Sequence, residues 1–288
     1  MISVPSDIPA IFGDDPGPIY RVGIERTPIS YPTRGNDDCN AIEDHSYWFV
    51  HRNRCLSSLL GSRIRSGVML DVGGGNGSTT AALRADGIDC WLVEPGVDGC
   101  HNAVSRCVPV IINNTLAELA LPGDSVGCIG LFDVIEHVPD VPSLLNEAFR
   151  VLAPDAVIAV TVPALRGLWS ADDVYAGHHR RYSTHRLTLD LEAAGFVVDR
   201  CRYLFGPLVM PLWLFRTIPS LLRLRRADDV ARAEREHGVG GGLFARIMSS
   251  LLRREAERIK RDRWPMLGTS CVAVAYKRHS PHEPNCHA

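Results

Sequence analysis

Two acidic residues beside a glycine-rich turn suggest a binding crevice. Asp71 stands in an apolar run that leads into Gly73–Gly77, and Glu94 ends the next apolar run. Glycines let the backbone turn sharply, and a helix that follows such a turn presents amide N–H groups and a positive end to a ligand. The turn lacks the Gly-Lys-Ser/Thr sequence of a phosphate-binding loop. Two carboxylates at one crevice therefore favour a ribose-bearing, positively charged ligand.

The segments that must position these acids predict an α/β sheet. Most of these segments are runs of apolar residues, as in parallel strands that are covered by helices on both faces. We expect strands at 68–72, 90–93, 108–112, 127–132, 156–162, 196–203 and 270–277. Helices are expected from Ser78, a good N-cap residue, over 97–106, and over 184–194 after Ser183 as a cap. A helical pattern from Ala41 predicts one more helix before the first of these strands.

Three motifs follow one another at characteristic spacing: Asp71–Gly77, Glu94, and the run Gly-Leu-Phe-Asp-Val-Ile-Glu-His-Val-Pro-Asp at 130–140. This series resembles that of the class I S-adenosylmethionine-dependent methyltransferases of the small-molecule type, over about residues 43–205 and 268–278. The resemblance implies a Rossmann-like methyltransferase fold, which is an α/β, doubly wound, mostly parallel seven-stranded sheet. It also implies S-adenosylmethionine as the cofactor and S-adenosylhomocysteine as its product.

The same resemblance implies roles for residues around the crevice. The glycine turn would wrap the methionine part of the cofactor, Glu94 would hold the ribose, and the loop after the fourth strand would border the sulfonium. Arg52, in the expected cap helix, could pair with the cofactor's carboxylate. The residues expected to bind the cofactor are Asp71, Gly73, Gly75, Gly77, Glu94, Thr115, Leu116, Phe132, Asp133 and Arg52.

Candidates for proton transfer lie in the two loops after the fourth and fifth strands. The second loop holds Gly-His-His-Arg-Arg-Tyr at 177–182, similar to a run in a methyltransferase subgroup. If the acceptor must lose a proton, we expect His178 or His179 to be the base, and then His137, which could equally be structural. We expect no metal, because no Cys or third His stands nearby at metal-ligand spacing.

Aromatic and basic residues near the crevice are expected to bind the acceptor: Tyr47, Trp48, Trp169, Tyr175, Arg180, Arg181 and Tyr182. A structural alternative stays open for these residues. The two arginines could pair with Asp172 or Asp173, His178 could hold the turn, and the aromatic rings could seal the edge of the sheet.

Composition limits the class of protein. The chain has 288 residues, 45% of them hydrophobic, and a net charge of −2, so it is globular and no nucleic-acid partner is expected. Its nine scattered cysteines indicate reduced, buried thiols in a cytoplasmic protein. The sequence begins without a basic start and apolar core, so we expect no signal peptide.

The chain divides into a core and three additions. We expect an irregular arm at 1–40, a core at 41–203 and 266–278, a helical insertion at 204–265, and a disordered tail at 279–288. The segment 203–265 carries thirteen Lys or Arg against seven Asp or Glu. Its apolar first part has the length of a membrane span, but three prolines interrupt it. The insertion could therefore close the acceptor pocket, form a homodimer or lie on a membrane surface.

The predicted function is methyl transfer to an O, N or C nucleophile of a small molecule, in natural-product, lipid-linked or sugar metabolism. Two other classes stay open. An NAD-type oxidoreductase would share the glycine turn and Glu94, although the motif at 130–140 speaks against it. A non-catalytic membrane-surface binding protein would keep the nucleotide fold and the insertion. The expected location is the cytoplasm, with membrane association left open.

Overall fold

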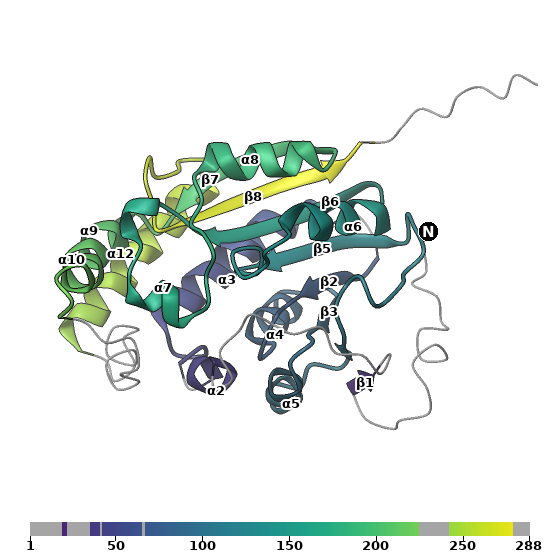
Figure 1. Ribbon diagram of the computed structural model, residues 1–288, viewed down its shortest axis with the longest axis horizontal. Coiled ribbons are helices and arrows are strands. Elements are labelled where there is room, and N and C mark those ends of the chain that lie inside the picture. Colours follow the sequence, from purple (N-terminus) through teal and green to yellow (C-terminus); the bar gives the residue numbers. More distant parts are fainter. Residues whose placement is uncertain (1–18, 22–34, 41, 65–66, 225–241, 279–288) are drawn as a thin grey trace, which may run out of the picture.

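The computed structural model describes residues 19–21, 35–40, 42–64, 67–224 and 242–278 (Figure 1). Within them, eight strands form one sheet in the order β1-β4-β3-β2-β5-β6-β8-β7. Only β8 runs antiparallel to its neighbours, β6 and β7. The strands are β1 (Ile19–Arg21), β2 (Met69–Val72), β3 (Cys90–Val93), β4 (Ile111–Asn113), β5 (Val126–Phe132), β6 (Leu152–Pro163), β7 (Phe196–Leu204) and β8 (Ser270–Lys277).

Seven of these strands are the predicted ones, and the doubly wound, mostly parallel fold is confirmed. The arm at 1–40 was predicted to be irregular, but it contains regular secondary structure. It contributes β1, which pairs in parallel with β4 at the edge of the sheet, and a short helix, α2 (Gly35–Asn40). The rest of the arm, residues 225–241 of the insertion and the tail lie outside the described residues.

Helices cover both faces of the sheet. They are α3 (Tyr47–Leu60), α4 (Ser78–Ala85), α5 (Val97–Ser105), α6 (Val141–Val151), α7 (Ala171–Tyr175), α8 (Thr184–Ala193), α9 (Val209–Leu212), α10 (Ile218–Leu221) and α12 (Leu243–Lys260). Three shorter turns are η1 (Arg166–Leu168), η2 (Gly206–Leu208) and the π-helical η3 (Trp213–Thr217). The apolar residues of α6 and α8 join one core cluster, and those of α3 and α12 join another.

Alternation along β6 explains why both faces carry a core. Ile158 and Val160 belong to the cluster under α6 and α8, whereas Val157 and Ala159 belong to the cluster under α3 and α12. Successive side chains of a strand point to opposite faces, so an unbroken apolar run needs helices on both sides. The insertion thus supplies α12 as part of the core packing.

The insertion gathers at one end of the sheet, where α9, α10 and α12 lie together (Figure 1). Its helix α12 packs against α3 through Ala245, Met248, Leu252, Ala256 and Ile259, which recur at helical spacing. No helix within the described ranges combines the length and apolar character that crossing a membrane requires. Eight of the nine cysteines lie in those ranges, and all eight are free thiols.

Candidate functional site

The glycine turn forms a left-handed corner between β2 and α4. Gly77 has a φ of +73° and is the N-cap of α4, so the prediction that Ser78 caps this helix is wrong. A Cβ at Gly77 would lie 2.8 Å from the Cβ of Ala103 on α5. A side chain is therefore excluded twice, by the backbone conformation and by the close approach of α5.

Asp71 lies beneath this turn. Its carboxylate is fully buried, and its Oδ2 accepts a hydrogen bond from the Thr80 hydroxyl at 2.7 Å. Its Oδ1 has no hydrogen-bond partner among the described residues. Burial raises the pKa of Asp71 to about 6. A buried acceptor atom without a donor beside a glycine turn fits a cationic ligand.

Glu94 holds the turn from the end of β3. Its two oxygens accept hydrogen bonds from the amides of Gly75 at 2.8 Å and Gly96 at 2.6 Å. Burial raises the pKa of Glu94 to about 7, although these two bonds act in the opposite direction. Each carboxylate oxygen has a second lone pair, so the same group can also accept from the hydroxyls of a ribose.

Arg52 of α3 contacts residues that follow β5 and that lie in α4. Its Nη1 pairs with Asp133 after β5, and its Nη2 donates to the Thr79 hydroxyl at 2.6 Å. The guanidinium also lies 4.9 Å from the centre of the Trp48 ring and 5.1 Å from that of Phe49. The structure thus brings two of the predicted residues together. Arg52 pairs with Asp133 of the same chain, whereas the sequence suggested that it could pair with the carboxylate of the cofactor.

Three of the residues expected to bind the cofactor, Thr115, Leu116 and Phe132, lie at or just after the ends of β4 and β5. The Thr115 amide donates a hydrogen bond to the side-chain Oδ1 of Asn114 at 2.8 Å. Leu116 and Phe132 are buried in the two main core clusters. Their side chains serve packing, so backbone atoms are what they can offer to a ligand.

A polar network that the sequence analysis missed ties α2 to the glycine turn. Asn76 donates from Nδ2 to the carbonyl of Asn36 at 2.8 Å and to Glu43 at 3.2 Å. Arg106 donates to the carbonyl of Asn76 at 3.1 Å, pairs with Glu43 at 3.1 Å and also contacts Asn40. The only signal in the sequence was the polar Asn76 within the turn, because its partners come from three separate segments.

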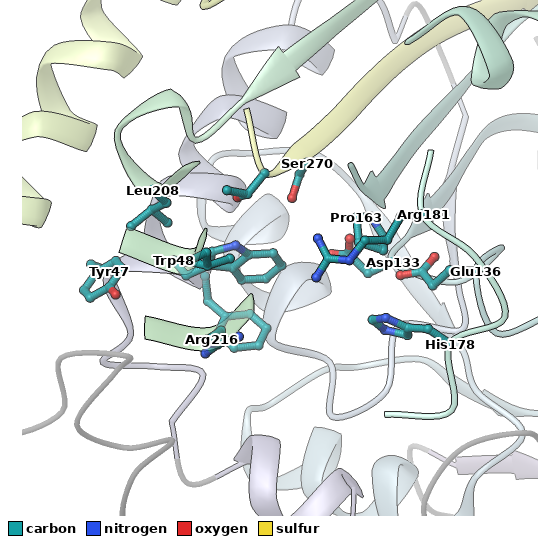
Figure 2. Close-up of a pocket in the computed structure, with 13 residues that line it drawn as sticks. Tyr47, Trp48, Asp133, Glu136, Pro163, His178, Arg181, Leu208, Arg216 and Ser270 are labelled. Carbon is teal, nitrogen blue, oxygen red and sulfur yellow. The ribbon is translucent and has the colours of Figure 1, made fainter. Parts of the chain in front are cut away.

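A cavity of about 220 Å³ opens beside Asp133 (Figure 2). Asp133, Glu136, His178 and Arg181 lie on one side of it, and Trp48 and Arg216 lie on the opposite side. The residues that line it are Tyr47, Trp48, Phe49, Asp133, Glu136, Pro163, His178, Arg181, Leu208, Leu212, Arg216, Thr269 and Ser270. Five predicted site residues, Tyr47, Trp48, Asp133, His178 and Arg181, therefore meet at one cavity.

Asp173 organises the loop that supplies His178 and Arg181. Its carboxylate is buried and lies 2.9 Å from Nδ1 of His178 and 2.7 Å from Nε of Arg181. It also accepts from the amide of Ser170 at 2.8 Å in the capping box of α7. Burial would raise the pKa of Asp173, but His178 and Arg181 hold it below its ordinary value. The pairing considered for the arginines is thus observed for Arg181.

The other predicted acceptor ligands point elsewhere. Tyr182 is buried in the core next to β6 and is not among the residues that line the cavity. Arg180 donates to the carbonyls of Val138 and Pro139, both at 3.1 Å. His179 is exposed, and neither it nor Trp169, Tyr175 or Arg180 lines the cavity. Neighbours in an extended loop face opposite sides, so adjacent residues of the same chemical type have different surroundings.

Glu136, His137 and His178 converge at the cavity wall, contrary to the expectation that no metal-ligand set is present. Potential ligand atoms of the three residues all lie within 4.8 Å of one another. Both carboxylate oxygens of Glu136 are buried and have no hydrogen-bond partner in the described ranges. Burial, and then the charge of Asp133, raises the pKa of Glu136 well above its ordinary value. Sequence spacing missed this set because His178 comes from a different loop.

The chain is similar to known methyltransferases over most of its core. A family model described as a methyltransferase domain matches residues 48–200. A probable S-adenosylmethionine-dependent methyltransferase of Mycolicibacterium smegmatis is 31% identical over 179 residues, which are 60% of this chain and 68% of that protein. A protein of the same description from Mycobacterium tuberculosis is 28% identical over 170 residues, 58% of this chain and 62% of that protein.

Solved structures support the fold. Phosphoethanolamine N-methyltransferase 2 of Haemonchus contortus gives a TM-score of 0.54 at 16% identity, over 86% of this chain and 58% of that chain. The [4+2]-cyclase SpnF gives 0.55 at 16% identity, over 89% of this chain and 100% of that chain. This chain thus spans less than two thirds of the Haemonchus enzyme and of the tuberculosis relative. At such identities these structures show a shared fold and leave the reaction open.

Proposed function

This chain belongs to the methyltransferase domain family as an S-adenosylmethionine-dependent enzyme, and we propose that its acceptor is a small molecule that binds in the cavity beside Asp133. The observation that carries the proposal is the position of the cavity, which borders Asp133 at the end of β5 and is roofed by the aromatic residues of α3. Its volume of about 220 Å³ fits a small acceptor or one end of a longer one, since drug-sized sites are usually about 300–1,000 Å³.

The residues around the glycine turn are proposed to hold the cofactor. Asp71 and Glu94 contribute buried carboxylates, and Gly73–Gly77 contribute backbone amides. S-adenosylmethionine supplies a methyl group that its sulfonium has already activated. The protein's task is then to orient the acceptor and exclude water, and little further chemistry is needed.

Two side chains at the cavity wall, His178 and Arg181, can help the acceptor to lose a proton. Because Asp173 is held as a carboxylate, His178 donates its Nδ1 proton to it, which selects the tautomer whose Nε2 carries the lone pair of the uncharged ring. That nitrogen can accept a proton from the acceptor or bind a cation. Arg181, fixed by the same Asp173, places a positive charge at the cavity wall.

A cavity-filling substitution tests where the acceptor binds. Leu212 lines the cavity, so Leu212→Trp should raise the KM for an acceptor about tenfold or more while the Kd for S-adenosylhomocysteine stays unchanged. The matched control is Leu214→Trp, since Leu214 lies two residues away and is exposed. Acceptors are found by measuring release of S-adenosylhomocysteine across a panel of small nucleophiles. Equal KM values for the two variants would contradict this binding site.

The segment that forms one cavity wall also carries an exposed apolar surface. Leu208, Leu212 and Arg216 line the cavity, and the same α9–η3 segment exposes Met210, Trp213, Leu214 and Phe215. Nearby, α12 and its C-cap residue carry Arg253, Arg254, Arg258 and Arg261 along a shared hollow. We propose that this surface lies on an anionic membrane and admits an acceptor with an apolar tail.

Vesicle flotation tests the membrane contact. The protein should float with vesicles that contain anionic phosphatidylglycerol more than with neutral phosphatidylcholine vesicles. Phe215→Glu should abolish the difference, whereas Leu189→Glu, at an exposed position on α8, should not. If the wild-type protein does not float and instead forms dimers that Phe215→Glu dissociates, the surface is a dimer interface and the membrane proposal is wrong.

A further inference from the structure

We propose that Glu136, His137 and His178 bind a divalent transition-metal ion at the wall of the acceptor cavity. Glu136 and His137 come from the turn after β5, and His178 comes from the loop after α7. The rings of His137 and His178 have their centres 4.8 Å apart. Two loops that are 40 residues apart in the chain thus deliver three ligand groups to one point.

The spacing of the three ligand atoms is close to that of a metal site. They lie within 4.8 Å of one another. In a tetrahedral site with bonds of about 2.1 Å, ligand atoms lie about 3.4 Å apart, so the most distant pair must approach by at most about 1.4 Å. Because Asp173 holds the ring of His178, this approach falls to the side chains of Glu136 and His137.

The buried carboxylate of Glu136 is the observation that points to a cation. Glu136 is 0% exposed, yet neither of its oxygens has a hydrogen-bond partner in the part of the chain that the structure describes. Buried polar groups in folded proteins are nearly always paired, and buried charges are paired or bind metals. A metal ion between Glu136 and the two imidazoles would satisfy this carboxylate.

The surroundings of His178 match those of a metal-binding histidine. Its Nδ1 lies 2.9 Å from the Asp173 carboxylate, which fixes the ring and leaves Nε2 for a metal. Metal-binding histidines usually donate their other ring nitrogen to a carboxylate or carbonyl in this way. Asp173 is itself held by Arg181 and by the amide of Ser170, so the ring cannot easily turn away.

The local charge also permits a cation. Three carboxylates, Asp133, Glu136 and Asp173, surround the cluster together with two guanidinium groups, Arg52 and Arg181. Each guanidinium is paired, Arg52 with Asp133 and Arg181 with Asp173. Neither arginine is therefore paired with Glu136, and the five groups sum to one negative charge when Glu136 is ionised, as it would be when it binds a cation.

The ligand types limit the ion and its role. Two imidazoles and one carboxylate suit zinc, iron, cobalt or manganese better than calcium or magnesium. Three protein ligands would leave a position open toward the cavity, where an oxygen or nitrogen of the acceptor could bind and release its proton to water more easily. This role, which rests on the proposed function, makes His178 a ligand and positions the nucleophile directly.

Metal titration of the tag-free, full-length protein tests the site. After dialysis against a chelator, Co²⁺ and Zn²⁺ are added, and binding is read from the visible absorption of Co²⁺ and from calorimetry. We expect one ion per chain. Glu136→Gln and His178→Ala should weaken binding about 100-fold or more. His179→Ala, the adjacent exposed histidine, is the control and should bind as the wild type does.

The same samples separate the metal proposal from the proposed function. Binding of S-adenosylhomocysteine is measured by calorimetry in each variant, and Glu136→Gln, which keeps the side-chain shape, should retain it. If the wild type shows no Co²⁺ absorption, or if Glu136→Gln binds the ion as tightly as the wild type, the metal site is wrong. Failure of cofactor binding in the wild type would instead contradict the proposed function.

Discussion

Replacing Glu94 with Gln should have opposite effects on stability above and below about pH 5. Burial raises the pKa of Glu94 to about 7 in the folded chain, whereas an unfolded glutamate has a pKa of about 4.3. The raised value means that folding favours the protonated form. This contribution to stability is complete below pH 4 and is lost as the pH rises through 7.

The size of the effect follows from that shift and from two hydrogen bonds. A shift of about 2.7 units corresponds to about 3.5 kcal/mol of stability lost by the wild type at pH 8. Glu94→Gln avoids this loss, but its amide group can accept from only one of Gly75 and Gly96, which costs about 1 kcal/mol. At pH 8 the variant should therefore be about 2–3 kcal/mol more stable than the wild type. At pH 5 the two effects nearly cancel, and at pH 4 the variant should be about 1 kcal/mol less stable.

Cofactor binding should respond in the opposite direction at pH 8. A carboxylate forms charge-assisted hydrogen bonds with ribose hydroxyls, each worth about 1.5–3 kcal/mol, so Glu94→Gln should weaken S-adenosylhomocysteine binding about 10- to 100-fold. The variant would gain stability and lose affinity, as is common at binding sites.

Urea unfolding without ligand at about pH 4 and pH 8, and calorimetric titration at about pH 8, measure the two effects. Asp98→Asn is the matched control, because Asp98 is exposed in the first turn of α5, four residues from Glu94. A variant less stable than the wild type at both pH values would refute the account of buried charge. Unchanged affinity would refute the contact with the ribose.

Two further predictions concern the elements that hold the site together. Arg106→Ala should destabilise the protein by about 3 kcal/mol, because it leaves Glu43 buried without its ion pair. It should also speed amide exchange in α2, whereas Arg63→Ala, at a more exposed ion pair, should do neither. Glu255→Ala should cost about 2–4 kcal/mol in urea unfolding, because Glu255 accepts from two backbone amides of the 205–206 turn. Glu257→Ala, on the exposed face of α12, should cost less than about 0.5 kcal/mol. Equal stability of either pair of variants would show that these contacts do not secure α2 or α12.

Much of the fold could be predicted because its signals are local. The strand over 270–277 was predicted with the bounds that β8 has, since an apolar run marks a covered strand wherever it occurs. The arm was harder, because β1 has only three residues and exists through its pairing with β4. Such a strand has no pattern of its own.

The sequence alone determined the core motifs of this protein: the order of the apolar runs, the glycine turn, and Glu94 at the end of β3. These features depend on each residue and its immediate neighbours. Only the tertiary structure decided that His178 faces the cavity while His179 and Tyr182 do not, and that Glu136 lies beside two histidines. The reason is geometric: the direction of a side chain on a loop is set by what the loop packs against, and that partner comes from a distant part of the chain.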